Sequence, residues 1–516
     1  MDKYVSIRLD RSLEKPLYVQ VCESIIELIE KNILLPEEKL PPIRKLASLL
    51  DVNTVTIVNA YKLLEKQGYV VSRVGSGTYI NPSILLNHQN LSKALSSQGV
   101  SLQKVSENPG VFNDSSPTPS NSALFDDISN VRSAIRYDFA GAAISPEFFP
   151  VEEFKEVLNE VLDRDRGYAF GYQESMGYAP LRKSISEFMA SEYNITFSPE
   201  EIQVVSGAQQ GIDIIAKAFL NYQDTVYVEG PTYTGAIDAF KSRGAKIVEI
   251  PLEPDGINID ELRSKLKVKP PRLFYTMPNF HNPTGYSYST QKKKELIALS
   301  RECDFLIVED DHMNDLYFAE KPSPLKAMDD GGNVLYIKSF SKLFMPGLRL
   351  AFIASRKDFA VKIADAKYYS DISSSGLTQR AMDLFFRKSL WPEHARRMRK
   401  IFREKWQAMN GAIEEYIPPG INYKSPGGGL FFWLELPQGY YSMNLYNEAL
   451  KYGLLLMPGD FFYPDRRPSN GFRLSFAEIA PENIRDGIKL LAETIEKLFQ
   501  EYKLNPLRGK NFRPLL

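Results

Sequence analysis

The residues most able to do chemistry are an amine, a carboxylate and two guanidinium groups that follow or lie in apolar, β-prone segments. Lys342 lies in YIKSFSKLFMPGLR, upstream of Arg349, and Asp310 ends FLIVED. A lysine or carboxylate at such a place is most often solvated or caps a helix. Arg473 lies in the apolar run GFRLSFA, where burial would require an anionic partner. Taken one at a time, each of these residues is more simply explained by an ordinary structural role.

Three loops add groups that bind phosphate or pack on rings. The segment GAQQ at 207–210 joins a predicted strand to a helix, and backbone N–H groups at a helix N-terminus bind phosphate. Tyr233 follows EGPT, and Asn282 begins NPTG after RLFYTMPNFH. Each of these loops is by itself more often an ordinary turn or a half-buried aromatic.

The elements that must position these residues alternate between strand and helix from Tyr137 onward. EIQVVSG precedes AQQGIDIIAKAFL, and DTVYVEG, AKIVEI, RLFYTMP, FLIVED, VLYIKSF and RLAFIAS follow. Such alternation predicts an α/β fold with a parallel or mixed sheet. Ligands of these sheets bind beyond the carboxyl ends of the strands, where the polar residues above are expected to gather.

As an ordered set, these motifs resemble the fold-type I aminotransferases over about 350 residues, from Asp138 to the C-terminal region. The resemblance implies large and small subdomains and the cofactor pyridoxal 5′-phosphate (PLP). Lys342 matches the lysine that bonds the PLP aldehyde, Asp310 the carboxylate that pairs with the ring nitrogen, and Arg473 the arginine for the substrate α-carboxylate. The other matched residues contact the ring face (Tyr233), the ring hydroxyl (Asn282), the phosphate (Ala208, Gln209, Ser339, Ser341, Arg349) or the phosphate of the neighbouring subunit (Tyr172).

One position departs from the family pattern. The family usually has Asp-x-Tyr after this strand, and here the residues are Asp310, Asp311 and His312. An imidazole can donate the same bond to the ring oxygen, but its ordinary pKa of about 6.5 predicts a more pH-sensitive cofactor linkage. The histidines show no metal-ligand spacing, so no metal site is expected.

The first 80 residues predict three helices and a hairpin. Apolar residues at Leu17, Val21, Ile25 and Leu28 have helical spacing, IRKLASLL at 43–50 is a second helix, and Asn53 caps a third that ends at Gly68. The β-prone runs 69–74 and 78–81 flank a glycine turn. This is the order of a winged helix-turn-helix.

Residues 15–80 resemble the GntR family of bacterial DNA-binding domains. Its phosphate-contacting arginine matches Arg44, and residues 39–73 carry six basic and two acidic side chains. The turn before the recognition helix has Asn53-Thr54 where an arginine is usual, so a single hydroxyl replaces a bidentate fork. The resemblance implies contacts with double-stranded DNA from Arg44, Lys45, Asn53, Thr54, Thr56, Gly75, Ser76, Gly77 and Thr78.

Residues 81–136 predict a linker between the head (1–80) and the body (137–516). Of these 56 residues, 25 are Ser, Asn, Pro or Gly, and apolar periodicity is weak, apart from a short helix expected near 91–102. As a coil this length spans about 40 Å. That reach lets a head cross to a second subunit.

Composition limits the class of protein. Of 516 residues, 63 are Lys or Arg and 64 are Asp or Glu, so DNA contacts must come from a local patch. Two cysteines, an N-terminus without an apolar core and no long apolar run predict a cytoplasmic protein with no disulfide framework, signal peptide or membrane span.

The head, linker and body in this order resemble the MocR/GabR family of bacterial transcription regulators over the whole chain. The resemblance implies a homodimer, compatible with a head-to-tail domain swap, in which a small amino-compound effector forms an external aldimine with PLP and switches DNA binding or activation. An active aminotransferase with a fused head and a head that docks a protein are the alternatives. The sequence leaves open turnover, the effector, the operator, and activation versus repression.

Overall fold

The computed structural model describes residues 2–4, 7, 17–30, 34, 38–50, 52–66, 70–73, 77–80 and 135–504. The chain divides into two compact units, Met1–Ser116 and Pro117–Leu516. Most of the predicted linker, including the helix expected near 91–102, lies outside the described residues. The domain boundaries at residues 80 and 136 therefore stay predictions.

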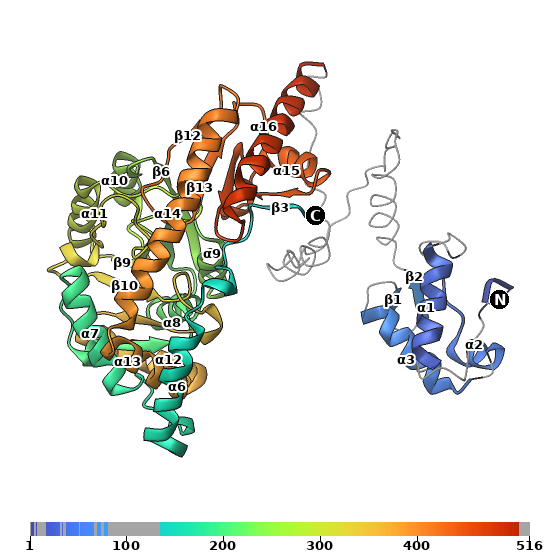
Figure 1. Ribbon diagram of the computed structural model, residues 1–516, viewed down its shortest axis with the longest axis horizontal. Coiled ribbons are helices and arrows are strands. Elements are labelled where there is room, and N and C mark those ends of the chain that lie inside the picture. Colours follow the sequence, from blue (N-terminus) through green and yellow to red (C-terminus); the bar gives the residue numbers. More distant parts are fainter. Residues whose placement is uncertain are drawn as a thin grey trace. The chain divides into compact units, whose positions relative to one another are not determined.

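The first unit contains the three helices and the hairpin that the sequence predicts. They are α1 (Leu17–Glu30), α2 (Ile43–Leu49), α3 (Thr54–Lys66), β1 (Val70–Arg73) and β2 (Gly77–Ile80), which follow one another in blue in Figure 1. The two strands are antiparallel, with Val70 opposite Ile80. The unit is thus a winged helix domain.

The core of this unit comes from the predicted helical stripe. Val21 and Ile25 of α1 pack with Leu46 of α2 and Ile57 of α3, all fully buried. Asn53 Oδ1 accepts a hydrogen bond from Val55 N at 3.0 Å, which satisfies a backbone donor at the start of α3. The predicted cap is confirmed.

The second unit is built on an eight-stranded sheet in the order β4-β11-β10-β9-β8-β5-β6-β7. Strands β6, β5, β8, β9 and β10 are parallel, and β11 is antiparallel to both of its neighbours. This confirms the predicted α/β alternation. The bounds are β4 (Ile202–Val205), β5 (Thr225–Gly230), β6 (Lys246–Glu253), β7 (Gly256–Ile257), β8 (Leu273–Thr276), β9 (Leu306–Asp311), β10 (Val334–Ser339) and β11 (Ala351–Ala354).

Helices cover both faces of this sheet, because its strands are apolar on both faces. Val228, Val308 and Ile337 point to one face and pack with α8 (Ala208–Phe219), α9 (Thr234–Ser242) and α12 (Lys357–Asp371). Phe274 and Tyr336 point to the other. That face is covered by α6 (Val151–Asp165), α7 (Ala179–Tyr193), α10 (Ile259–Val268), α11 (Thr290–Glu302) and α13 (Gly376–Arg387).

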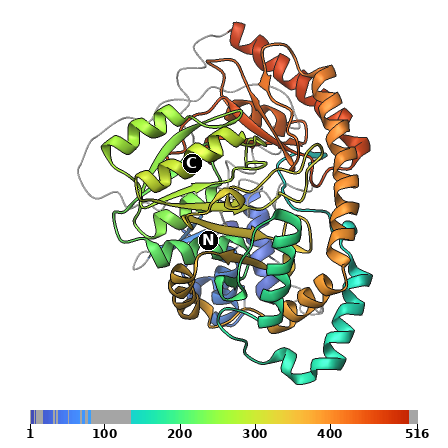
Figure 2. The same cartoon turned by 90° about the vertical axis from the view of Figure 1, so that its left-hand side faces the viewer.

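A smaller subdomain completes the second unit. Its antiparallel sheet has the order β12-β13-β16-β15, with β12 (Asn422–Tyr423), β13 (Phe431–Glu435), β15 (Met457–Pro458) and β16 (Gly471–Ser475). Strand β3 (Tyr137–Asp138) pairs with β14 (Leu454–Leu455), and α15 (Ser442–Leu450) and α16 (Pro481–Leu504) pack nearby. The long helix α14 (Leu390–Tyr416) runs along the edge of the unit from the large subdomain to the small one (Figure 2).

Candidate functional site

The carboxylate at the end of β9 has one oxygen free for a ligand. Asp310 is buried, and its Oδ2 accepts a hydrogen bond of 2.7 Å from the Tyr275 hydroxyl. Its Oδ1 is also buried and has no hydrogen-bond partner in the described part of the chain. Burial raises the pKa of the Asp310 carboxyl to about 7; the Tyr275 bond opposes the rise, and the charges of Asp311 and Glu229 add to it. The free oxygen is suited to a cationic N–H donor.

The amine that follows β10 is poised to react. Lys342 Nζ donates a hydrogen bond of 2.9 Å to the Ala142 carbonyl. Burial lowers the pKa of the Lys342 amine to about 8, and the positive charges of Arg473 and Arg349 lower it further, against Glu478 and Asp310. A lysine with a depressed pKa presents more neutral amine, which is the nucleophilic form.

A buried guanidinium closes the opposite side of the site. Arg473 on β16 donates to Asn282 Oδ1 at 2.8 Å and to the Ala140 carbonyl at 2.7 Å. Among the described residues, its Nε is buried without a hydrogen-bond partner, and no carboxylate forms an ion pair with it. Burial lowers its pKa to about 10, although the negative charge of Asp138 opposes the shift. A buried cation without an anionic partner is an anion-binding site.

The N-terminus of α8 forms an anion cradle with Arg349. Gly207, at a φ of 88°, precedes Ala208, the first residue of the helix. Arg349 donates to the Ser206 carbonyl at 3.2 Å and lies directly against Gly207. Ser339 Oγ, at the end of β10, accepts from Ser341 N at 3.3 Å. Helix N–H groups, hydroxyls and a guanidinium are a donor set for phosphate.

Tyr233 begins α9 beside this cradle. Its hydroxyl donates to Gln209 Oε1 at 3.1 Å, and Gln209 in turn donates to the Gly235 carbonyl at 2.8 Å. Burial raises the pKa of Tyr233 to about 12, and the charge of Asp310 contributes to the rise. Contacts and charge interactions thus link most of the residues predicted to hold the cofactor within one subunit, namely Asp310, Lys342, Arg349, Tyr233, Gln209 and Asn282. Ser339 ends β10, and Ser341 lies in the turn that leads to Lys342.

The prediction that the His312 imidazole keeps its ordinary pKa is wrong. Burial lowers the pKa of its imidazole to about 3, and the charges of Lys342 and His281 lower it further. Both ring nitrogens are buried without hydrogen-bond partners among the described residues. His312 therefore stays neutral near physiological pH. One of its ring nitrogens can donate a hydrogen bond and the other can accept one, and neither adds a charge to the site.

Tyr172 stands apart from the other predicted residues. It is 88% exposed, and Tyr168 and Phe170 near it are 84% and 68% exposed. Gln173 N donates to Ser373 Oγ at 3.4 Å, which brings this loop beside the C-terminal end of α12 and its exposed Tyr369. These four exposed aromatic side chains lie on two segments that contact one another, and they are called the aromatic patch below.

A buried carboxylate that the sequence analysis missed organises the strand ends. Glu229, at the end of β5, is fully buried and accepts hydrogen bonds from Tyr288 at 2.6 Å and Thr276 at 2.7 Å. His281 Nε2 lies 3.0 Å from the other oxygen. Because its partners lie 47 to 59 residues away, no local pattern reveals this network.

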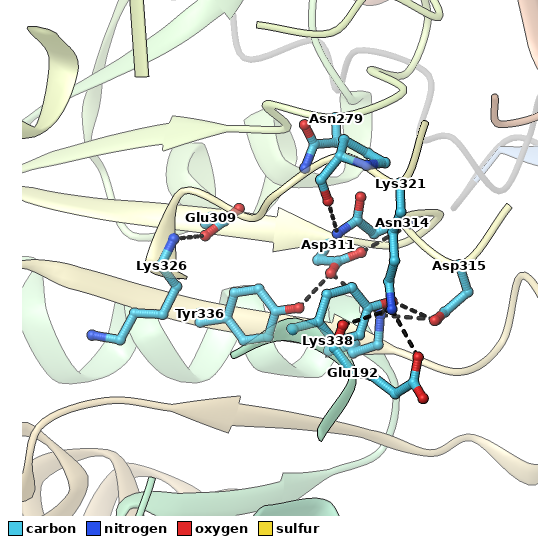
Figure 3. Close-up of polar contacts among 12 residues, drawn as sticks. Glu192, Asn279, Glu309, Asp311, Asn314, Asp315, Lys321, Lys326, Tyr336 and Lys338 are labelled. Atoms are coloured by element: carbon cyan, nitrogen blue, oxygen red, sulfur yellow. Dashed lines mark hydrogen bonds and ion pairs between the residues drawn. The ribbon is translucent and has the colours of Figure 1, made fainter. Parts of the chain in front are cut away.

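A second missed network, drawn in Figure 3, lies like Glu229 on the face of the sheet away from Asp310. Lys338 is 1% exposed and lies 3.2 Å from Asp311 and 2.9 Å from Asp315. The hydroxyl of Tyr336 donates to Asp311. Neighbouring residues of a strand point to opposite faces, so this ionic cluster holds β9 from behind while Asp310 faces the site. A lysine inside the apolar run VLYIKSF was the one available signal.

The DNA-contact residues predicted in the head are described in part. Lys45, Asn53 and Thr54 are exposed, and Thr56 and Thr78 are half-buried. Gly77 begins β2. The Arg44 side chain, Gly75 and Ser76 lie outside the described residues. The exposed groups cluster on α2 and at the start of α3, where a helix-turn-helix meets DNA.

No group of three or more His, Cys, Asp or Glu side chains in the described ranges could hold a metal ion. None of the helices described is long and apolar enough to cross a bilayer.

The chain matches two family models. Residues 145–491 match "Aminotransferase class I and II", and residues 17–80 match "Bacterial regulatory proteins, gntR family". The first match spans more than half of the chain and includes every residue of the site on the large and small sheets. The second spans the winged helix domain.

Three relatives are similar to this chain, one over nearly its whole length and two over the body. The aromatic-amino-acid aminotransferase 1 of Thermococcus litoralis is 35% identical over 69% of this chain and 87% of its own. The uncharacterized HTH-type transcriptional regulator YisV of Bacillus subtilis is 30% identical over 95% of this chain and 98% of its own. The structure of LysN, an α-aminoadipate aminotransferase of Thermus thermophilus, has a TM-score of 0.67 and 33% identity, over 72% of this chain and 95% of its own.

The cofactor of this family, PLP, fits the residues present. LysN was solved as a complex with N-(5'-phosphopyridoxyl)-L-leucine. In the present chain, Asp310 Oδ1 is an acceptor without a donor, and a side chain at Gly207 would fill the cradle beside Arg349. The amine of Lys342 has a lowered pKa. The chain belongs to the class I and II aminotransferase family and carries a GntR-family DNA-binding head, which is the architecture of the MocR-type transcription regulators.

Proposed function

We propose that this protein is a PLP-dependent, DNA-binding transcription regulator switched by a small amino compound. The observation that carries the proposal is a GntR-family head in one chain with a Lys342 of lowered pKa and a buried Arg473 that forms no ion pair among the described residues. An amino acid, or another acid that carries an amine, supplies the partner for both groups. The head supplies DNA binding, which an enzyme does not need.

When bound, PLP supplies an aldehyde that bonds amines and a ring that withdraws electrons. In this proposal Lys342 would hold that aldehyde, and Asp310 Oδ1 would accept a hydrogen bond from the protonated ring nitrogen. The neutral His312 is placed to hydrogen-bond the ring oxygen together with Asn282. The ring face and the phosphate fall to Tyr233, Ala208, Gln209, Ser339, Ser341 and Arg349.

The effector competes with a backbone carbonyl of this chain for the Arg473 guanidinium. The Ala140 carbonyl occupies Arg473, and the Ala142 carbonyl accepts from Lys342. Both belong to the segment that starts at β3, directly after the predicted linker. An acid bound at Arg473 displaces the Ala140 carbonyl, so ligand binding loosens the segment that follows the predicted linker. A coupling of about 1–3 kcal/mol is enough for such a switch.

The test is a DNA-shift titration of the full chain with its own upstream region, with and without PLP and a panel of amino acids, γ-amino acids and aminosulfonates. We expect one class of acid to change the midpoint or mobility only when PLP is present. Binding to DNA that no amine alters over the whole panel would contradict the proposal.

A second function is supported by the completeness of the site. Lysine, aspartate and carboxylate-binding arginine are all retained, and two of the three relatives named above are aminotransferases. Conversion of an amino acid to its keto acid over many turnovers, at a rate that exceeds single-turnover formation of the aminated cofactor, would favour the enzyme.

We also propose a homodimer, arranged so that Tyr172 of each subunit contacts the phosphate of the other. The aromatic patch supports this, because such exposed apolar surface usually marks an interface. It borders the cofactor cradle, since Ser206 Oγ lies 3.4 Å from Ser374 Oγ, beside Ser373. Two heads then read two half-sites of an operator in double-stranded DNA. We propose a cytoplasmic location and domains 1–80 and 137–516 joined by residues 81–136.

Replacing Gly207 with alanine is expected to weaken PLP binding about tenfold or more. A Cβ at Gly207 would lie 2.4 Å from Arg349 Nη2, and the φ of 88° is strained for alanine. Titration of the cofactor-free protein with PLP measures the effect. Gly211→Ala on the same helix is the matched control, since its Cβ would meet no atom nearer than 3.4 Å. Equal affinities of the two variants would contradict the cradle.

Replacing Lys45 with alanine is expected to reduce DNA affinity similarly for all sequences. Lys45 is exposed on α2, and no carboxylate of the described residues pairs with it. Loss of one phosphate contact should make the slope of log affinity against log salt less negative by about 0.9. Lys267→Ala, an exposed position on α10, should leave the slope unchanged. An unchanged slope in the Lys45 variant would place this lysine outside the DNA interface.

A further inference from the structure

Tyr275 donates a hydrogen bond to the Asp310 carboxylate, and the proposed function assigns this tyrosine no role. Tyr275 on β8 is 0% exposed, and its ring packs edge-on against Phe240 of α9, with centroids 5.8 Å apart. Strand β8 lies next to β9, with Tyr275 opposite Val308. The ring therefore has no freedom to move away from Asp310.

The hydrogen bond between these residues runs in one direction. Burial and the charge of Asp310 raise the pKa of the Tyr275 phenol well above its ordinary value, whereas the pKa of Asp310 is about 7. The proton stays on the phenol, so Tyr275 donates and Asp310 accepts. This bond favours the ionised carboxylate and opposes the effects of burial and of Asp311 and Glu229.

Tyr275 is also the donor that decides which oxygen of Asp310 is free. Oδ2 accepts from the phenol at 2.7 Å, and Oδ1 has no partner among the residues described. We propose that Tyr275 is a positioning residue that keeps Asp310 ionised, with Oδ1 turned to the cofactor ring nitrogen, and so sets the proton affinity of the bound ring. The proposal rests on the role proposed above for Asp310.

The chain offers a matched control on the other side of β9. Tyr336 on β10 is equally buried, and its hydroxyl donates to Asp311, the next residue after Asp310, on the opposite face of the sheet (Figure 3). Removing either hydroxyl deletes one oxygen from a buried phenol–carboxylate pair. Only Tyr275 touches the carboxylate that faces the site.

The experiment compares Tyr275→Phe with Tyr336→Phe in the full chain. Each cofactor-free protein is titrated with PLP and with an analogue in which carbon replaces the ring nitrogen. We expect Tyr275→Phe to lower the affinity for PLP about tenfold to a hundredfold, the usual effect of a hydrogen bond to a charged group. Affinity for the analogue should change little, so the preference for PLP falls. Tyr336→Phe should keep the wild-type preference.

A second readout is the pH titration of the visible band of the PLP-bound protein. If Asp310 stabilises the protonated ring nitrogen less well, the ring withdraws fewer electrons. The midpoint of this titration, which reports protonation of the Lys342 nitrogen, should then move to higher pH in Tyr275→Phe only. If that variant does not fold, 3-fluorotyrosine at position 275, a stronger donor, should move the midpoint to lower pH. Thermal unfolding without cofactor verifies that both variants are intact.

Two results would overturn the proposal. One is an unchanged preference for PLP in Tyr275→Phe, and the other is an equal loss in both variants, which would indicate a general effect of buried polarity. A wild-type protein that does not distinguish PLP from the analogue would refute the Asp310 role and this inference together. The DNA-shift titration tests the regulatory function independently of this result.

Discussion

Replacing Lys342 with alanine is expected to abolish both the visible absorbance of the PLP-treated protein and the response of DNA binding to amines. Lys342 is the amine of lowered pKa at the carboxyl edge of the sheet, between the Asp310 carboxylate and Arg473. Without it, the cofactor has no covalent anchor and the Ala142 carbonyl has no donor from this side chain. DNA affinity in the absence of effector should stay within about twofold, because the head folds around its own core.

Absorbance spectra and DNA-shift titrations of the two proteins measure these effects. Lys362→Ala, an exposed lysine on α12, is the control and should keep both properties. If the Lys342 variant still responded to the effector with wild-type affinity, the ligand would act elsewhere. The body would then serve as a dimerisation scaffold.

Replacing Arg473 with glutamine is expected to lower effector affinity about thirtyfold or more and to leave PLP bound. Removing one member of a buried, hydrogen-bonded charge pair commonly costs about 2–5 kcal/mol. Here the effector's acid would be left without its cation, and Asn282 Oδ1 would lose its 2.8 Å donor. The guanidinium also lies 4.4 Å from the Phe431 ring centroid, so lost packing contributes.

The concentration of effector that gives half of the DNA response measures this loss. Arg473→Lys should fall between wild type and Arg473→Gln, since an ammonium retains the charge but not the two parallel donors. Arg485→Gln, an exposed arginine on α16, is the control for a lost surface charge. An effector that binds Arg473→Gln as tightly as wild type lacks an acid group at this position.

The parts of the site that could be predicted are those that follow directly from strands. Asp310 and Ser339 end the apolar strands β9 and β10, and parallel strands bring their carboxyl ends to one edge. Lys342 follows in the same turn. The head was predictable because Leu17, Val21 and Ile25 repeat at helical spacing and Asn53 caps the next helix.

The parts of the site that could not be predicted are contacts between residues far apart in the sequence. Arg473 meets Asn282 across 191 residues and Ala140 across 333. The bond between Tyr275 and Asp310 spans 35 residues, and β8 and β9 become neighbours only when the sheet forms. The pKa of His312 was misjudged for the same reason, since the burial that lowers it comes from segments remote in sequence.

The sequence by itself determined which groups exist and the local elements that carry them: a winged helix head, an α/β body, a lysine, a carboxylate and an arginine for an amino acid and its cofactor. Local spacing is sufficient for this, because helices and strands form from neighbouring residues. Only the tertiary structure decided that Arg473 forms no ion pair among the described residues, that the Ala140 carbonyl accepts from it, and that Asp310 Oδ1 has no hydrogen-bond partner in this part of the chain. Burial and pairing are properties of packed segments, and packing joins residues that the chain keeps far apart.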